Sequence, residues 1–241
     1  MDHEFPHNDG TNACVFLALK ICDIFKRNES PDDRVPSWEE LERITEEMIK
    51  TLPAKINSVR NSSEKYDPII AKTILTSNNL LEGNYELSEE CVSNYGVFTE
   101  LGRKELINAL ANEKLTRTKK SVGLYTCAPY TFLVGIYNGS FFIVDTHPIG
   151  EELGGNGNAI LVRTRDKDLR SCRLIIQWII KRLKNSGVSE EAAQSFAWLT
   201  EVPVEGCSEK QSNQADVDFS NSAHRARDAR SNIHTSDMLE V

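Results

Sequence analysis

Apolar residues recur at helical spacing through the first half of the chain and gather into short continuous runs in the second half. Helical spacing predicts helices over 13–27 and 38–51, and in the stretches "YDPIIAKTILTSNNLLEG" and "TELGRKELINALANEK". The stretch "LSEECVSNYG" is compatible with one more, short helix. Boundary signals support these helices: Asn12 or Thr11 as the first cap, Ser37 with Glu40 as a capping box, Pro68 in a first turn, Thr99 as a cap and Gly96 as a stop.

The second half is rich in β-branched and aromatic residues, which favour strands. We predict strands in "SVGLYTCA", "YTFLVGIYNG", "SFFIVDTHP" and "NAILVRTR". Asn138-Gly139 between two apolar runs is typical of a type I′ hairpin turn. A long helix over 167–185 ended by Gly187, a short helix near 189–195 and a last strand in "SFAWLTEV" complete the pattern.

From about residue 205 the chain is polar and has few apolar residues, so we expect a disordered tail over 205–241. Residues 1–204 then form one domain, with helices first, an antiparallel sheet next and a covering helix last. This order predicts the α+β class.

Composition excludes several classes of function. The chain has 241 residues, 39% of them hydrophobic, and a net charge of -8, which argues against a nucleic-acid binder. It has no apolar run of membrane-spanning length and no signal-peptide core, so we expect no membrane association and a cytoplasmic or nuclear location. Its six cysteines lack CxxC spacing, which predicts free thiols with no disulfide, metal or cofactor.

The histidines narrow the candidate chemistry. Of five, only His147 belongs to a strongly predicted element, at the end of the strand "SFFIVD". Asp145 lies two positions earlier, and side chains at i and i+2 share one face of a strand. A carboxylate in that place orients an imidazole ring and selects its tautomer. A local hydrogen bond without function is the alternative interpretation of this pair.

Cys14 is the best candidate nucleophile because it lies in the first turn of a predicted helix. Free backbone N–H groups and the helix dipole lower a thiol pKa there, and the same N–H groups can hold an oxyanion. An asparagine at 8 or 12 offers a further amide donor. Cys14 as core filler remains open, and Cys127 at a strand end is the second candidate.

Taken together, a cysteine on a first helix followed by a sheet that carries the histidine is the chain order of papain-like cysteine hydrolases. The stretches "GTNACVFLAL" and "FFIVDTHP" resemble the viral-tegument-type deubiquitinases, the family of herpesvirus large-tegument-protein proteases and their cellular relatives. The resemblance covers roughly residues 8 to 165. It implies a papain-like fold with Cys14 as nucleophile, His147 as general base and Asp145 as the orienting acid.

The resemblance also implies the reaction, which is hydrolysis of an isopeptide bond after the C-terminal Gly-Gly of ubiquitin or a ubiquitin-like protein. We expect the chain to be a monomer. The family takes an oxyanion-hole glutamine from upstream of the cysteine, and this chain has no glutamine before Gln177. Asn8, six residues before Cys14, is the candidate substitute. Two alternatives stay open: an inactive ubiquitin-binding module of the same fold, and a papain-like peptidase, acyltransferase or transglutaminase with another substrate.

Overall fold

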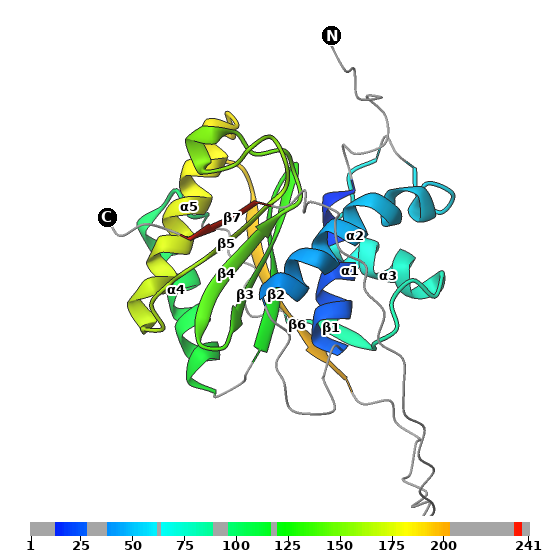
Figure 1. Cartoon of the computed structure of the whole chain (residues 1–241), viewed down its shortest axis with the longest axis horizontal. Helices are drawn as coiled ribbons and strands as arrows, with labels where there is room; N and C mark the ends of the chain where they lie inside the picture. The colour runs from blue at the N-terminus through cyan, green and yellow to red at the C-terminus, as the bar shows by residue number, and fades with distance from the viewer. Residues whose placement is uncertain are drawn as a thin grey trace, which may run out of the picture.

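A seven-stranded sheet lies between two groups of helices in the computed structural model of the chain (Figure 1). The structure describes residues 13–27, 38–61, 64–88, 96–116 and 120–202, and the backbone of 234–237. One face of the sheet carries α1 (Cys14–Arg27), α2 (Trp38–Ile56) and α3 (Pro68–Ser77). The other face carries α4 (Glu100–Leu115) and α5 (Cys172–Asn185). The predicted mixture of helices and antiparallel sheet is confirmed.

The strand order is β1-β6-β2-β3-β4-β5-β7. All neighbouring pairs are antiparallel except β5 with β7, which is parallel. The parallel edge strand and the short β1 were not predicted. The strands are β1 (Tyr85–Leu87), β2 (Lys120–Cys127), β3 (Tyr130–Tyr137), β4 (Ser140–Asp145), β5 (Ile160–Arg163), β6 (Gln194–Glu201) and β7 (His234–Asp237).

Each face of the sheet has its own apolar core, because side chains alternate between the faces along a strand. Leu133 of β3 and Val144 of β4 pack in the core beneath α1, α2 and α3. Their neighbours Val134 and Ile143 pack in the core beneath α4 and α5. The central strands are therefore buried on both faces, which explains why their sequences read as continuous apolar runs and do not alternate.

Several local predictions are confirmed. Helix α1 begins one residue after the predicted start and ends at the predicted residue, Arg27. The Thr99 hydroxyl caps α4 by accepting from the backbone N–H of Gly102 at 3.0 Å. Asn138 and Gly139 have φ of 50° and 81°, as a type I′ turn requires. Pro68 opens α3, whose cap is Asp67.

Other predictions were wrong or lie outside the described residues. Residues 189–193 form no helix: they are a turn and bend, and β6 begins at Gln194. Helix α2 continues through Pro53 to Ile56, because Leu52 and Ile56 are buried one turn apart and hold the last turn in the core. In the expected tail, 234–237 is a strand, since it pairs with the edge of β5. The proposed caps at 11, 12 and 37, the stretch 89–95 and the rest of the tail lie outside the described residues.

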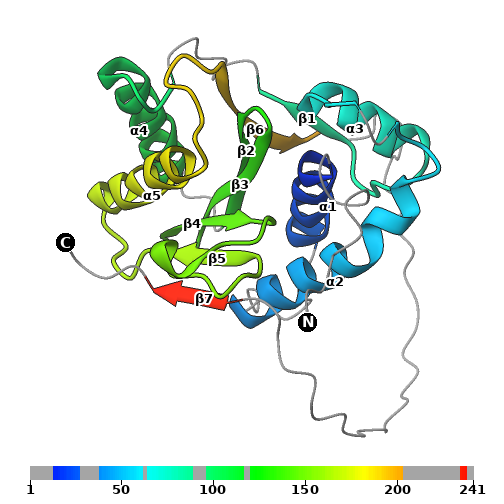
Figure 2. The ribbon, with the colours of Figure 1, turned by 90° about the horizontal axis from the view of Figure 1, so that it is seen from above.

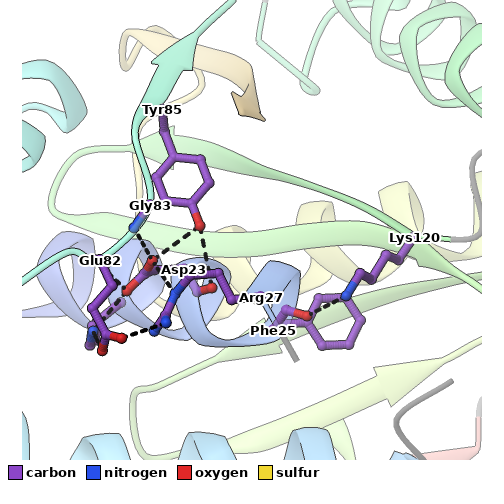
Figure 3. Close-up of polar contacts among 8 residues, drawn as sticks. Asp23, Phe25, Arg27, Glu82, Gly83, Tyr85 and Lys120 are labelled. Atoms are coloured by element: carbon purple, nitrogen blue, oxygen red, sulfur yellow. Dashed lines mark hydrogen bonds and ion pairs between the residues drawn. The ribbon is translucent and has the colours of Figure 1, made fainter. Parts of the chain in front are cut away.

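A buried carboxylate joins α1 to the chain that leads into β1 (Figure 3). Asp23 is fully buried and accepts hydrogen bonds from the backbone N–H of Gly83 at 3.1 Å and the hydroxyl of Tyr85 at 3.0 Å. It also forms ion pairs with Lys20 at 2.7 Å and Arg27 at 3.0 Å. Burial opposes ionisation of Asp23, but Lys20, the N–H of Gly83 and Arg27 together lower its pKa, so the carboxylate stays ionised and holds α1 in place.

Candidate active site

Three elements bring the candidate residues together at one end of the sheet. Cys14 is the first residue of α1, and that helix lies against the faces of β2 and β3 (Figure 2). Its side chain is buried, and its sulfur lies 3.5 Å from the carbonyl oxygen of Pro129, next to the start of β3. His147 and Thr131 lie close enough to the thiol to lower its pKa. Residues far apart in sequence thus meet at the start of α1.

Asp145 and His147 are in contact, but for a different reason from the one predicted. Asp145 is the last residue of β4, and His147 lies beyond the strand in the loop that follows. The two are therefore not neighbours on one face of a strand. One carboxylate oxygen of Asp145 instead accepts from the backbone N–H of His147 at 2.9 Å and contacts its ring Nδ1 at 2.5 Å. Because Asp145 occupies Nδ1, Nε2 is the ring nitrogen available for proton transfer.

Arg182 completes the surroundings of Asp145, and sequence reasoning missed it. Its Nε donates to the second carboxylate oxygen of Asp145 at 2.8 Å. A signal was present in the sequence: Ile175, Trp178, Ile179 and Arg182 share the buried face of α5. An arginine on the apolar face of a helix calls for a buried anion as its partner.

Tyr130, the first residue of β3, was also missed. Its ring lies under the Arg182 guanidinium, with 4.6 Å from the central carbon to the ring centroid. The same ring meets the His147 ring edge to face, with centroids 5.0 Å apart. Tyr130 therefore packs between the arginine and the imidazole and limits the movement of both.

The electrostatics of the site favour the charged forms of Cys14 and His147. Burial opposes ionisation of Cys14, yet its hydrogen bond to His147, the charge of His147 and the Thr131 donors lower the pKa of the thiol below its ordinary 9.0. Burial opposes the charged form of His147 too, but Asp145 and Cys14 raise the pKa of that ring to about 10. The two shifts have opposite directions, so both favour a thiolate beside an imidazolium.

Asp145 is wholly buried, and burial alone would favour its neutral form. Its hydrogen bond to His147 and the charges of His147 and Arg182 outweigh burial and lower the pKa of the carboxyl. Asp145 is thus an anion held between two cations. A carboxylate held in this way orients an imidazolium and stabilises its charge.

The other described cysteines lack this environment. Cys22, Cys127 and Cys172 are buried free thiols. Burial raises the pKa of Cys127, the second candidate nucleophile, to about 11, and it raises the pKa of Cys22 and Cys172 as well. Asn8, the candidate oxyanion-hole residue, lies outside the described residues.

Within the described ranges, no group of three or more histidine, cysteine, aspartate or glutamate side chains is arranged to hold a metal ion. No helix among these residues is both long and apolar enough to cross a membrane.

Comparisons with known proteins give little at the level of sequence. No protein-family model and no curated protein matches the chain. A solved structure that matches is the ubiquitin-specific protease encoded by a murine cytomegalovirus tegument protein, in complex with a ubiquitin-based suicide substrate. It is 9% identical, the match covers 83% of this chain and 82% of that chain, and the TM-score is 0.40. A TM-score this low assigns neither a fold nor a substrate to this chain.

Proposed function

We propose that the chain is a papain-like cysteine peptidase with Cys14 as nucleophile, His147 as general acid and base, and Asp145 as the residue that orients His147. One observation carries the proposal: Asp145 contacts Nδ1 of His147 at 2.5 Å, His147 and Cys14 act on one another, and the pKa of each of the three groups moves toward its charged form. A thiolate is the reactive form of cysteine, and an adjacent imidazolium both maintains it and supplies the proton that the reaction needs.

Acylation follows from this geometry. The Cys14 sulfur attacks the substrate carbonyl carbon, a C–S bond forms, and the carbonyl oxygen becomes an oxyanion. The first N–H groups of α1 have no partner within the helix, so the N–H of Cys14 is the proposed donor to that oxyanion. We propose the Asn8 side chain as a second donor. His147 then gives its proton to the leaving amine as the C–N bond breaks, which leaves a thioester on Cys14 and a neutral imidazole.

Deacylation uses the same groups in reverse order. Neutral His147 takes a proton from water as the water oxygen attacks the thioester, and the C–S bond breaks. The acid product leaves, and the thiolate–imidazolium pair is restored. Asp145 keeps Nδ1 of His147 occupied throughout, so that Nε2 is the nitrogen that exchanges protons with the reacting atoms.

For the substrate, we propose the C-terminal Gly-Gly of ubiquitin or a ubiquitin-like protein joined to an amine. This part rests on the resemblance of "GTNACVFLAL" and "FFIVDTHP" to the viral-tegument-type deubiquitinases. The two stretches are the ones that carry Cys14 and His147, so the resemblance and the triad involve the same residues.

Release of a fluorescent amine from the C-terminus of ubiquitin tests the proposal. We expect release by the native chain and loss of at least about 1,000-fold in Cys14→Ala, because no other residue supplies the nucleophile. Cys22→Ala is the matched control on the same helix and is expected to retain activity. A ubiquitin ending in Ala-Ala is the control substrate and is expected to be cleaved poorly.

The outcomes separate the alternatives. Full activity in Cys14→Ala would refute the nucleophile assignment. Tight binding of ubiquitin without release by the native chain would indicate an inactive binding module. Cleavage of unrelated thioesters or peptides in preference to ubiquitin would indicate a different papain-like hydrolase or an acyltransferase.

A further inference from the structure

Arg182 is a buried cation whose position the triad chemistry described above does not use. It lies in the last turns of α5, on the face that packs against the sheet, and its side chain is 9% exposed. Its Nε is 2.8 Å from one oxygen of Asp145, while the other oxygen of Asp145 is 2.5 Å from Nδ1 of His147. Each carboxylate oxygen of Asp145 thus contacts a different cation.

The rest of the guanidinium is held as well. One terminal nitrogen donates to the hydroxyl of Ser186, and the guanidinium plane lies over Tyr130. Because Tyr130 also touches the His147 ring, arginine and histidine share both a carboxylate and an aromatic neighbour. Contacts with Asp145, Ser186 and Tyr130 therefore hold Arg182 next to the triad.

We propose that Arg182 is a positioning residue of the catalytic triad, which holds one oxygen of Asp145 and balances its charge so that the other oxygen stays on His147. The inference rests on the proposed function, because it assigns Arg182 to that same site. Arg182 acts through Asp145 and does not touch the reacting atoms.

The charges of Cys14, His147, Asp145 and Arg182 add up to zero in the reactive form. The groups that act on Asp145 are His147 and Arg182, and the groups that act on His147 are Asp145 and Cys14. In the reactive form two anions, Cys14 and Asp145, face two cations, His147 and Arg182. A buried set of zero net charge avoids the large penalty of an uncompensated buried ion.

Removing the positive charge of Arg182 leaves this set with one excess negative charge. Protons then bind more readily, so the pKa values of Asp145, Cys14 and His147 all rise. An opposite charge in contact with a carboxylate changes its pKa by about 1–3 units. Because coupled groups titrate together, the acid midpoint at which Cys14 becomes reactive is expected to move upward by about one pH unit.

The experiment measures the rate at which iodoacetamide alkylates Cys14 as a function of pH, with peptide mass spectrometry to identify the residue. Arg182→Gln removes the charge and keeps a hydrogen-bond donor. Arg182→Lys keeps the charge. Arg173→Gln is the matched control, because Arg173 lies exposed on the same helix. We expect an upward shift of the midpoint in Arg182→Gln, and midpoints near that of the native chain in Arg182→Lys and Arg173→Gln.

A midpoint that does not move in Arg182→Gln overturns the inference, because a merely structural arginine changes the amount of folded protein and leaves the midpoint alone. If Arg182→Gln does not fold, Arg182→Met removes the same charge and fills the space of the arginine stem with an apolar side chain. A folded Arg182→Met that keeps the native midpoint then overturns the inference. The alkylation needs no ubiquitin, so failure of ubiquitin cleavage refutes the proposed function separately.

Discussion

Replacing His147 with glutamine removes the cation that lowers the pKa of the Cys14 thiol, while keeping a side chain of similar length. In the native chain burial raises the pKa of Cys14, and His147 is the main influence that reverses this. We therefore predict that the pKa of Cys14 in His147→Gln rises above the ordinary 9.0 of a cysteine.

Another thiol in the same fold supplies the magnitude. Cys127 is buried, burial is the cause of its shift, and its pKa rises to about 11. A Cys14 with burial but without His147 should move in the same direction, about 2 units above 9.0, which corresponds to roughly 2.7 kcal/mol against the thiolate. At neutral pH the thiolate population, and with it the rate of alkylation, should fall by about 100-fold or more.

The assay is alkylation of folded protein by iodoacetamide over a range of pH, with the labelled cysteine identified by peptide mapping. Circular dichroism at each pH confirms that the variant is folded, and Cys127 provides an internal comparison within each sample. The reasoning would be refuted if Cys14 in His147→Gln were alkylated with the same pH midpoint as in the native chain.

Three further predictions concern the fold and the pH range of activity. Asp23→Asn should lower the free energy of unfolding by about 2–3 kcal/mol in urea titrations, because Lys20 and Arg27 lose their buried partner, and an unchanged midpoint would contradict this. Folding lowers the pKa of Asp23, so its contribution to the free energy of unfolding is fully present above the unfolded pKa and is lost as the pH falls through the folded pKa. The free energy of unfolding of Asp23→Asn should therefore lack this dependence on acid pH. Gly139→Val should destabilise the hairpin by about 1–2 kcal/mol, because φ is 81° there, and equal melting temperatures would contradict the turn assignment. The pH profile of kcat/KM for ubiquitin cleavage should rise as Cys14 ionises and fall as His147 loses its proton near pH 10, whereas a monotonic rise would exclude the ion pair.

Local signals in the sequence predicted the elements that depend on local physics. The Thr99 cap and the Asn138-Gly139 turn were confirmed because each depends on a few adjacent residues. The short helix at 189–195 failed because the segment forms a turn before β6, and Gln194, the first residue of β6, accepts from the backbone N–H of Val97 at 2.9 Å. That bond spans 97 residues, and no local pattern contains it.

In the candidate site, too, local features could be predicted from the sequence and contacts between distant residues could not. Cys14 at a helix start and the spacing of Asp145 and His147 could be identified from sequence, and the structure brings the three together. The contact between Asp145 and His147 depends on a turn beyond β4, so the reason given from strand alternation was wrong. Arg182 and Tyr130 were missed, since their roles depend on how α5 and β3 pack around Asp145.

The central claim is that Cys14 is a nucleophile activated by His147 and Asp145 toward the C-terminus of ubiquitin. The most direct measurement is reaction of the native chain with a ubiquitin that carries a C-terminal propargylamide, followed by peptide mapping of the adduct. We predict one adduct, on Cys14, which persists in Cys22→Ala and forms much more slowly in His147→Gln. An adduct on another cysteine, or no adduct on a Cys14 that iodoacetamide still alkylates, would contradict the claim.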